Sequence, residues 1–427
     1  MSTRRFGLLA TLCLSVGVLT LAPGVANASG APVEEARANG TFVQMTFNDP
    51  EPGTSDTTIT DHLRNLITDA HPHSDVRVAL HSITGRGIKD AIVGETPGQD
   101  LGAGDVTVVM DGTKMGSSGS LAWELKRDVQ ANGGRFVICG PNNSPDDTSD
   151  MGACLGNRAT SRQHAKYVLI EAGWKRTGAS QGYHSSIVWM GSANITASSG
   201  WEAYNDAATV YGDADLYNGL VNEIFDVAAS ESWSSNDFYD NPNGNGYVHG
   251  PSANVSVFAS PETTTGRDQL LERLNDVRPG PGCTVAVMQM LFQGERGQDI
   301  ARKLERIRWP SWPSSSPQCS VYVLVDRKSD GSPSLGDAVE DILCDSVRPV
   351  PVKSFQGIHD KALLISADYL GAYKQVVFTG SHNISDPARE ENDEVLARVG
   401  QGSGAIYDRF AQHFSGPYHS TSAANAC

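Results

Sequence analysis

The sequence predicts an α/β fold made of two similar halves, each an α-β-α sandwich. Short apolar runs with strand spacing alternate with amphipathic helical segments along the 427 residues. A set of polar motifs occurs twice, in the same order. Between the two copies, residues 236–252 are rich in Asn, Gly, Pro and Ser, a composition typical of a linker. We therefore expect one half over residues 29–235 and the other over residues 253–427.

The predicted strands and helices follow one another in the same order upstream of each copy of the motifs. In the first half, the patterns predict a helix over residues 121–130 and strands over residues 76–80, 106–110 and 135–138. In the second half, they predict helices over residues 297–307 and 335–343 and strands over residues 284–290, 320–325 and 350–355. This repeated alternation indicates α/β layers in each half.

The first residues have the pattern of a secretory signal peptide. Two arginines precede an apolar run over residues 6–21, and Ala26-Asn27-Ala28 supplies small residues for cleavage. A membrane anchor is the weaker alternative because the run is short, and no later stretch reaches about 18 apolar residues. We expect residues 1–28 to be removed and the remaining chain to be secreted.

The composition is that of a globular protein, with 39% hydrophobic and 19% charged residues. The formal net charge is −16, and it becomes −18 when the signal peptide leaves with its two arginines. A chain this negative is not attracted as a whole to nucleic acid or to an anionic membrane. Any anionic ligand must therefore be held by a local basic site.

Six cysteines remain once Cys13 has left with the signal peptide. An even number in an oxidising compartment predicts disulfides, and no Cys or His pair has the spacing of metal ligands. We favour one of about 15 possible connectivities. In it, the first pair of cysteines closes a loop. The two cysteines of the second pair stand just before two predicted strands, and they can meet if those strands are neighbours. The pairs are Cys139–Cys154, Cys283–Cys319 and Cys344–Cys427. No metal or other cofactor is expected.

The repeated motifs place the same polar side chains in both halves. His164-Ala165-Lys166 corresponds to His359-Asp360-Lys361, 195 residues later, and Gly191-Ser192-Ala193-Asn194 corresponds to Gly380-Ser381-His382-Asn383, 189 residues later. A histidine two residues before a lysine on a strand lies on the same face, because strand side chains alternate. Lysine as a point charge, Ser and Asn as hydrogen-bond donors and His as nucleophile or acid suit a phosphoryl group. Two copies in register therefore indicate a phosphoryl site.

At these residues the sequence resembles the phospholipase D superfamily, whose duplicated signature is His-x-Lys-x4-Asp followed by Gly-Gly or Gly-Ser and an Asn. The resemblance covers nearly the whole mature chain, including Phe47-Asn48-Asp49-Pro50 and also Asn392-Asp393-Glu394, which is similar to the family's Asn-x-Glu. The motif Asp is replaced by Glu171 in the first half and by Ser366 in the second. We expect Ala207 to occupy the place that Glu394 has in the second half.

The resemblance implies a phospholipase D-like fold whose halves are related by a pseudo-twofold axis, with the active site between them. One histidine would attack the phosphodiester phosphorus and become a covalent phosphohistidine, while the other would protonate the leaving oxygen and later activate water or an alcohol. We assign His164 as the nucleophile, oriented by Glu171, and His359 as the acid and base, oriented by Glu394. The opposite roles remain open, because Glu171 could orient His164 for acid work.

The expected site residues follow from the same resemblance. The catalytic set comprises His164, His359, Lys166 and Lys361, and the substrate-binding set comprises Asn194, Asn383, Ser192, Ser381, Glu171 and Glu394. No metal ligand is expected, because the lysines, asparagines and serines can neutralise the developing charge.

The leading interpretation is a secreted phosphodiesterase of phospholipase D type that hydrolyses the headgroup of glycerophospholipids or transfers it. A secreted metal-independent nuclease and a degenerate, non-catalytic phosphate-binding protein are the alternatives. Negative charge favours lipid, as do Trp309 and Trp312, in a segment that either inserts into lipid or packs on the protein. We expect a monomer without a transmembrane segment, with a phospholipid at a membrane or micelle surface as its partner and nucleic acid less favoured.

Overall fold

The computed structural model describes residues 32–37, 40–96, 99, 105–140, 151–156, 158–178, 180–229, 247–249, 255–261, 268–310, 316–401 and 404–427. The expected signal peptide and most of the expected linker lie outside these residues. No helix in the described part of the chain is long and apolar enough to cross a membrane.

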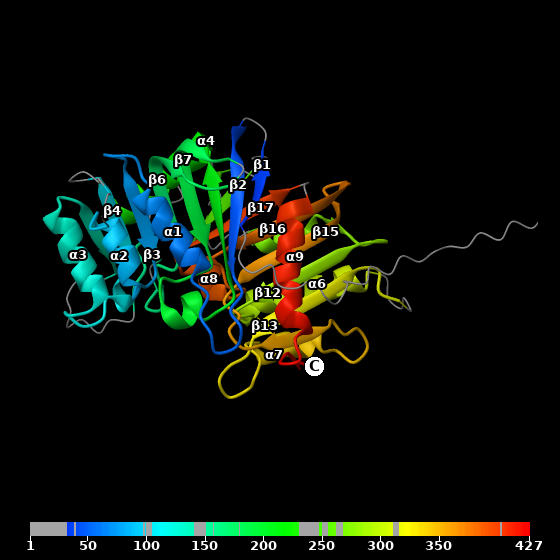
Figure 1. Ribbon diagram of the computed structural model, residues 1–427. Helices are drawn as coiled ribbons and strands as arrows, with labels where there is room; N and C mark the ends of the chain where they lie inside the picture. The colour runs from blue at the N-terminus through cyan, green and yellow to red at the C-terminus, as the bar shows by residue number, and fades with distance from the viewer. Residues whose placement is uncertain are drawn as a thin grey trace, which may run out of the picture.

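The first sheet contains the strands that precede the expected linker and has the order β1-β2-β8-β7-β6-β3-β4-β5 (Figure 1). Its strands are β1 (Val33–Ala36), β2 (Phe42–Asn48), β3 (Val76–Leu80), β4 (Val106–Asp111), β5 (Arg135–Cys139), β6 (Tyr167–Lys175), β7 (Gly182–Gly191) and β8 (Asn205–Tyr211). The helices of this part are α1 (Thr58–Thr68), α2 (Arg86–Ile92), α3 (Leu121–Ala131) and α4 (Ala214–Ala229). The three predicted strands are confirmed as β3, β4 and β5, and the predicted helix as α3.

The second sheet has the order β18-β14-β13-β12-β15-β16-β17-β10-β9, with β11 also paired to β15. Its strands are β9 (Tyr247–His249), β10 (Ser256–Ser260), β11 (Val277–Arg278), β12 (Thr284–Gln289), β13 (Ser320–Asp326), β14 (Val352–Phe355), β15 (Lys361–Tyr369), β16 (Ala372–Gly380), β17 (Glu394–Gln401) and β18 (Ala424–Asn425). The helices are α5 (Gln269–Asn275), α6 (Gly294–Arg308), α7 (Asp337–Leu343), α8 (Asp386–Glu390) and α9 (Gly404–His419). Here too the predicted strands (β12, β13 and β14) and helices (α6 and α7) are confirmed, with ends shifted by up to three residues.

Apolar side chains on both faces of each sheet hold these layers together. Leu63 of α1 and Leu125 of α3 pack against the first sheet in one buried cluster, and Ile300 of α6 packs against the second sheet in another. A third cluster contains residues of both sheets together with Leu216 of α4 and Phe410 of α9. Burial on both faces explains why the strands are nearly continuous apolar runs. The predicted fold class, two α/β halves with helices on both faces of each sheet, is confirmed.

Three disulfides lie at the edges of these layers. They join Cys139 to Cys154, Cys283 to Cys319 and Cys344 to Cys427. The predicted connectivity is therefore confirmed. The second disulfide connects residues that directly precede β12 and β13, which are neighbouring parallel strands, as the sequence argument required.

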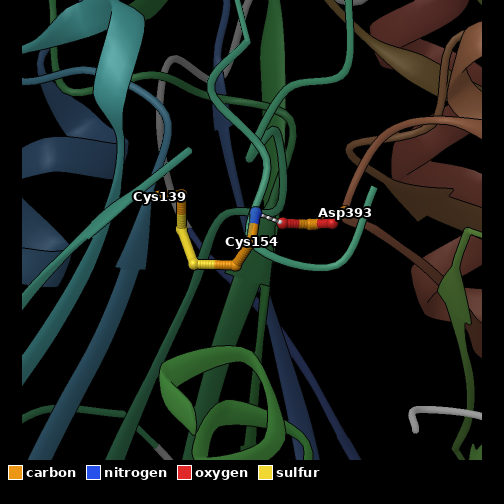
Figure 2. A group of neighbouring side chains, drawn as sticks. All are labelled: Cys139, Cys154 and Asp393. Carbon is orange, nitrogen blue, oxygen red and sulfur yellow. Dashed lines mark hydrogen bonds between the residues drawn. A yellow bond between two sulfur atoms is a disulfide. The ribbon is translucent and has the colours of Figure 1, made fainter. Parts of the chain in front are cut away.

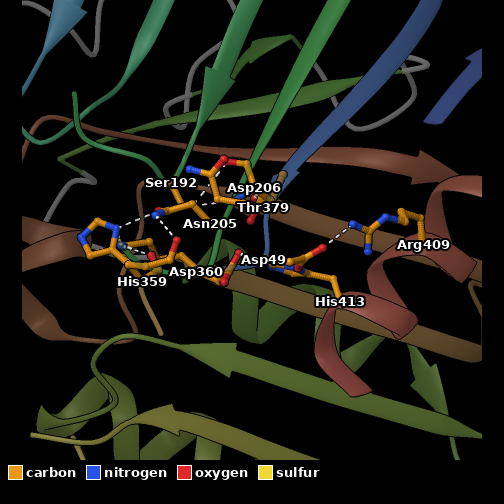
Figure 3. A network of polar contacts seen from close by, with 12 residues as sticks. Asp49, Ser192, Asn205, Asp206, His359, Asp360, Thr379, Arg409 and His413 are labelled. Carbon is orange, nitrogen blue, oxygen red and sulfur yellow. Dashed lines mark hydrogen bonds and ion pairs between the residues drawn. The ribbon is translucent and has the colours of Figure 1, made fainter. Parts of the chain in front are cut away.

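A buried ionic network connects α9 to Asp49 of the first half and to Asp360, which directly follows the motif residue His359 (Figure 3). The imidazole of His413 contacts the Asp49 carboxylate through Nδ1 and the Asp360 carboxylate through Nε2, the latter at 3.0 Å. Burial opposes the charge on His413, but the two carboxylates outweigh it and raise its pKa to about 10. Asp206, next to Asp360, is also buried and its pKa is raised well above the usual value. The cationic His413 thus links Asp49 of the first half to Asp360 of the second half.

We expect replacement of His413 by glutamine to lower the free energy of unfolding by about 3–5 kcal/mol, because it leaves the fully buried Asp360 carboxylate without its cationic partner, whereas Asp49 keeps Arg409. The folded-state pKa of His413, about 10, lies above its unfolded value of about 6.5. Its contribution is therefore fully present below pH ~6.5 and is lost as the pH rises through the folded-state pKa. Urea unfolding at increasing pH should show that the difference in unfolding free energy between wild type and His413→Gln becomes smaller. An unchanged gap would contradict this, and the exposed His73 provides a control as His73→Gln.

Candidate functional site

The two His-x-Lys motifs lie next to each other and form one buried site. His164 and Lys166 stand at the entrance to β6, and His359 and Lys361 at the entrance to β15. Each lysine Nζ donates to the backbone carbonyl of the histidine two residues before it, at 2.5 Å in the first half. Both lysines act electrostatically on both histidines, so the structure brings these four predicted residues together.

The carboxylate of Glu394 orients His164. Nδ1 of His164 lies 2.9 and 2.8 Å from the two Glu394 carboxylate oxygens, and the His164 backbone N–H donates to the Asp393 carbonyl at 2.9 Å. Glu394 begins β17, so the partner comes from the opposite half of the chain. Because a carboxylate can only accept from Nδ1–H, the other ring nitrogen, Nε2, is left for chemistry.

An amide takes the same place beside the other histidine. Nδ1 of His359 lies 3.0 Å from Oδ1 of Asn205 and 3.1 Å from Nζ of Lys361. The His359 backbone N–H donates to the Tyr204 carbonyl at 3.0 Å. Asn205 begins β8 and precedes Glu394 by the same 189 residues that separate the two Gly-Ser-x-Asn motifs. The prediction that Ala207 is the counterpart of Glu394 is therefore wrong. Asn205 could have been found by carrying the 189-residue offset across the motif.

Glu171 does not reach the site. Its side chain is exposed on β6, where the carboxylate accepts a weak hydrogen bond of 3.4 Å from the Asp75 backbone. Six residues lie between it and His164, and most of them belong to β6, so the two side chains are roughly 20 Å apart. The expected contacts of Glu171 with His164 and of Glu394 with His359 are replaced by the Glu394–His164 pair. Ser366, at the matching position, contacts the Tyr373 hydroxyl instead.

The motif serines brace the strands that carry the orienting groups. Ser192 Oγ accepts from Asp206 N–H at 3.0 Å and donates to Asn205 Oδ1 at 2.9 Å, whereas Ser381 Oγ accepts from Val395 N–H at 3.0 Å. Gly380 precedes Ser381 with φ of +143°, and a Cβ there would lie 2.2 Å from the Val395 carbonyl oxygen. The serines thus have structural partners, and their contact with a substrate stays a prediction.

The two motif asparagines each keep one unused acceptor. Asn194 donates through Nδ2 to Ser199 Oγ at 2.8 Å, but its Oδ1 is buried without a hydrogen-bond partner among the described residues, as is Oδ1 of Asn383. Buried amide oxygens without partners are uncommon in folded proteins. They mark positions where a donor on a ligand would be accommodated. Substrate binding by Asn194 and Asn383 therefore stays a prediction.

Burial and the lysines keep both imidazoles neutral. Burial first, and then the positive lysines, lower the pKa of His164 and of His359 well below the usual value. Burial also lowers the pKa of Lys166, and that of Lys361 to about 8. A neutral imidazole is the form that can attack phosphorus. A phosphodiester anion entering the site would raise all four pKa values, because a nearby negative charge favours the protonated forms.

The segment that carries Glu394 is fixed by a disulfide-bonded loop of the first half (Figure 2). The fully buried Asp393 carboxylate accepts from the backbone N–H groups of Cys154, Leu155 and Gly156 at 2.7 to 3.1 Å. Cys139, Cys154 and Asp393 are also the one group in the described part of the chain close enough to share a metal ion. The two sulfurs are bonded to each other, so they offer no thiolate ligands and the group serves as a structural clamp.

A cleft of about 860 Å³ opens beside His359. Its lining includes the acidic Glu202 and Asp326, the basic Lys328 and the aromatic Tyr204 and Phe355. The cleft therefore carries both signs of charge and is large enough for a polar group attached to the phosphate. Elsewhere, Trp309 packs back and donates through Nε1 to the Pro349 carbonyl at 3.4 Å, whereas Trp312 lies outside the described residues.

Comparison with known proteins gives matches among solved structures. No family model matches the chain, and no curated protein matches it. A phosphatidylserine synthase from Haemophilus influenzae Rd KW20 is 12% identical, with a TM-score of 0.54 over 87% of this chain and 86% of that one. A polyphosphate kinase from Porphyromonas gingivalis is 12% identical, with a TM-score of 0.49 over 87% of this chain. The chain spans about half (49%) of the length of that kinase. Nuc, a phospholipase D family member from Salmonella typhimurium, is 18% identical, with a TM-score of 0.29 over 40% of this chain and 96% of that one. With its two halves and paired His-x-Lys motifs, the chain has the phospholipase D-like fold.

Proposed function

We propose that this chain is a secreted phosphodiesterase of phospholipase D type that acts on the headgroup of glycerophospholipids. The observation that carries the proposal is the pairing of two neutral histidines, each held at Nδ1 by an acceptor from the opposite half and each followed by a buried lysine. A degenerate binding protein would have no need for both oriented imidazoles. The three disulfides and the predicted signal peptide support secretion.

In the proposed reaction, Nε2 of His164 attacks phosphorus and forms a P–N bond while the bond to the leaving alcohol breaks. His359, protonated in the substrate complex, gives its proton to the leaving oxygen and then takes one from the incoming water or alcohol, which releases the phosphoryl group from His164. The Glu394 carboxylate favours His164 as nucleophile, because it stabilises the cationic phosphohistidine. Neutral Asn205 offers His359 no such charge. Lys166 and Lys361 offset the charge on the phosphoryl oxygens.

Lipid is preferred to nucleic acid as the substrate class on two grounds. The net charge of −16 disfavours binding of a polyanion, and the cleft beside His359 holds acidic, basic and aromatic side chains, which suit a zwitterionic headgroup. The similar structure from Haemophilus influenzae bears the name of a phospholipid-forming enzyme. A nuclease remains the outcome to be tested against this proposal.

We expect the purified mature chain to release the headgroup from phosphatidylcholine vesicles and to leave single- and double-stranded DNA intact. Activity on a soluble diester should survive EDTA, because the site's own lysines provide the positive charge. His164→Ala protein serves as the blank for contaminating enzymes. Cleavage of DNA without lipid turnover would favour the nuclease, and a metal-reversible loss on the soluble diester would contradict the charge assignment.

A further inference from the structure

A third histidine, His81, lies beside the motif histidine of the first half. It directly follows β3, and its ring centroid is 4.8 Å from that of His164 with an interplanar angle of 70°. The side chain is 12% exposed. A positive charge on His81 would lower the pKa of both His164 and His359, so the three rings interact. His81 is therefore part of the same centre, although it belongs to neither repeated motif.

Asp111 and a backbone carbonyl fix the orientation of the His81 ring. Nδ1 of His81 lies 3.1 Å from the Gln163 carbonyl oxygen and 3.4 Å from Oδ2 of Asp111. The fully buried Asp111, at the end of β4, is itself held at Oδ1 by the Thr113 N–H at 2.8 Å. Since a carbonyl oxygen only accepts, Nδ1 carries the proton. No described residue forms a hydrogen bond with Nε2 of His81, so this nitrogen is available to a ligand.

The arrangement occurs in one half only. In the first half, Ala79 pairs with Tyr167, the residue after the motif lysine. In the second half, Met288 pairs with Ala362, which also directly follows the motif lysine. Two residues further along, Met290 is therefore the counterpart of His81. Asp326 matches Asp111 at the end of the next parallel strand, but it accepts from the backbone N–H groups of 357 and 358. A thioether cannot donate a hydrogen bond, so the two sides of the site differ in chemistry.

We propose that His81 is a substrate-binding residue that donates a hydrogen bond from Nε2 to a phosphoryl oxygen on the His164 side, with Asp111 as the residue that positions it. The proposal rests on the proposed phosphodiesterase function and adds a third histidine to it. In the free protein His81 is neutral, because burial outweighs Asp111 and lowers its pKa. A bound anion makes the protonated ring favourable, and Asp111 stabilises the charge on the opposite nitrogen.

Two substitutions at position 81 test the role of His81 through the binding of tungstate, an oxyanion whose binding does not depend on catalysis. Tungstate stays a dianion near neutral pH, so its binding by calorimetry reports the protein's own protonation. We expect His81→Phe, which keeps the ring, to raise the Kd about tenfold through loss of one charge-assisted hydrogen bond. His81→Gln keeps a donor and should remain within about threefold of wild type. His71→Phe, at an exposed histidine next to Ala172 at the other end of β6, should bind as wild type does.

The pH dependence separates binding by His81 from a structural role. The charged and titratable groups that interact with His81 are Asp111, Lys114, Lys166, His164 and His359. Tungstate binding by wild type should weaken as the pH rises, and this slope should shrink in His81→Phe but not in the control His71→Phe. Equal affinity and equal slopes in wild type and His81→Phe would overturn the proposal. If His81→Phe does not fold, Asp111→Asn replaces it and should also weaken tungstate binding, and unchanged binding would overturn the proposal equally.

The same proteins distinguish this proposal from the proposed function. If wild type binds tungstate through His81 but hydrolyses no diester, the result supports the phosphoryl-binding role of His81 and contradicts the proposed enzymatic function. If wild type hydrolyses diesters and His81→Phe has the wild-type kcat/KM and tungstate affinity, the role of His81 alone falls.

Discussion

Replacement of His164 or His359 by alanine is expected to lower kcat on any phosphodiester substrate by at least about 10⁴-fold, the scale of losing a nucleophile or its acid in other covalent mechanisms. Each histidine has its own orienting partner, Glu394 or Asn205, and each would perform a step that the other cannot. The double variant should be no worse than either single variant, because the two act as a unit. Initial rates on a soluble diester and on vesicles measure this.

The fold must be shown to survive these changes. Far-ultraviolet circular dichroism and the urea midpoint of each variant should match wild type, since His164 and His359 lie at strand entrances and not within the apolar cores. The exposed His73 offers a matched surface control as His73→Ala. Activity close to wild type in either motif variant would rule out the two-histidine mechanism.

Replacement of Glu394 by glutamine is expected to lower kcat by about 10²- to 10⁴-fold, as for other buried carboxylates that orient a catalytic imidazole. Glutamine retains an acceptor for His164 Nδ1 but removes the charge that stabilises a cationic phosphohistidine. KM should change little, because Glu394 contacts His164 and not the substrate. The measurement is the separate determination of kcat and KM on a soluble diester.

Glu171→Gln provides the matched control for this effect. Glu171 is the acidic residue that the sequence motif points to, but its carboxylate contacts the Asp75 backbone on an exposed strand. We expect it to leave kcat within about twofold of wild type, as for most surface changes. A large loss in Glu171→Gln together with an active Glu394→Gln would show that the sequence pattern, and not the observed contact, identifies the orienting group.

The fold could be predicted well from the sequence because its signals are local or repeated. Buried strands such as β3 and β13 are nearly continuous apolar runs, and such runs can be identified directly in the sequence. The offset of 195 residues between His164 and His359 revealed the second half without any structural knowledge. The Cys283–Cys319 disulfide could be predicted because these two cysteines directly precede adjacent strands.

The orienting contacts could not be predicted in the same way. Glu394 reaches His164 because the entrance to β17 crosses to the other half, where the Gln163 segment pairs with Asp393. No spacing in the sequence encodes that crossing. Asn205 was missed because an amide replaces the acid that the pattern seeks. His81 was missed because a single histidine after a strand is usually a surface residue, and its place beside His164 depends on the pairing of β3 with β6.

Covalent labelling of the histidine nucleophile tests the central claim most directly. A slow diester labelled in its phosphoryl group would be mixed with the mature chain, quenched during the burst, and the peptides mapped by mass spectrometry under conditions that preserve phosphohistidine. We predict label on His164, because Glu394 supplies the negative charge that the phosphorylated ring requires. Label on His359 would reverse the roles of the two histidines, and a demonstrated burst with label on neither would contradict the covalent mechanism and indicate direct attack by water.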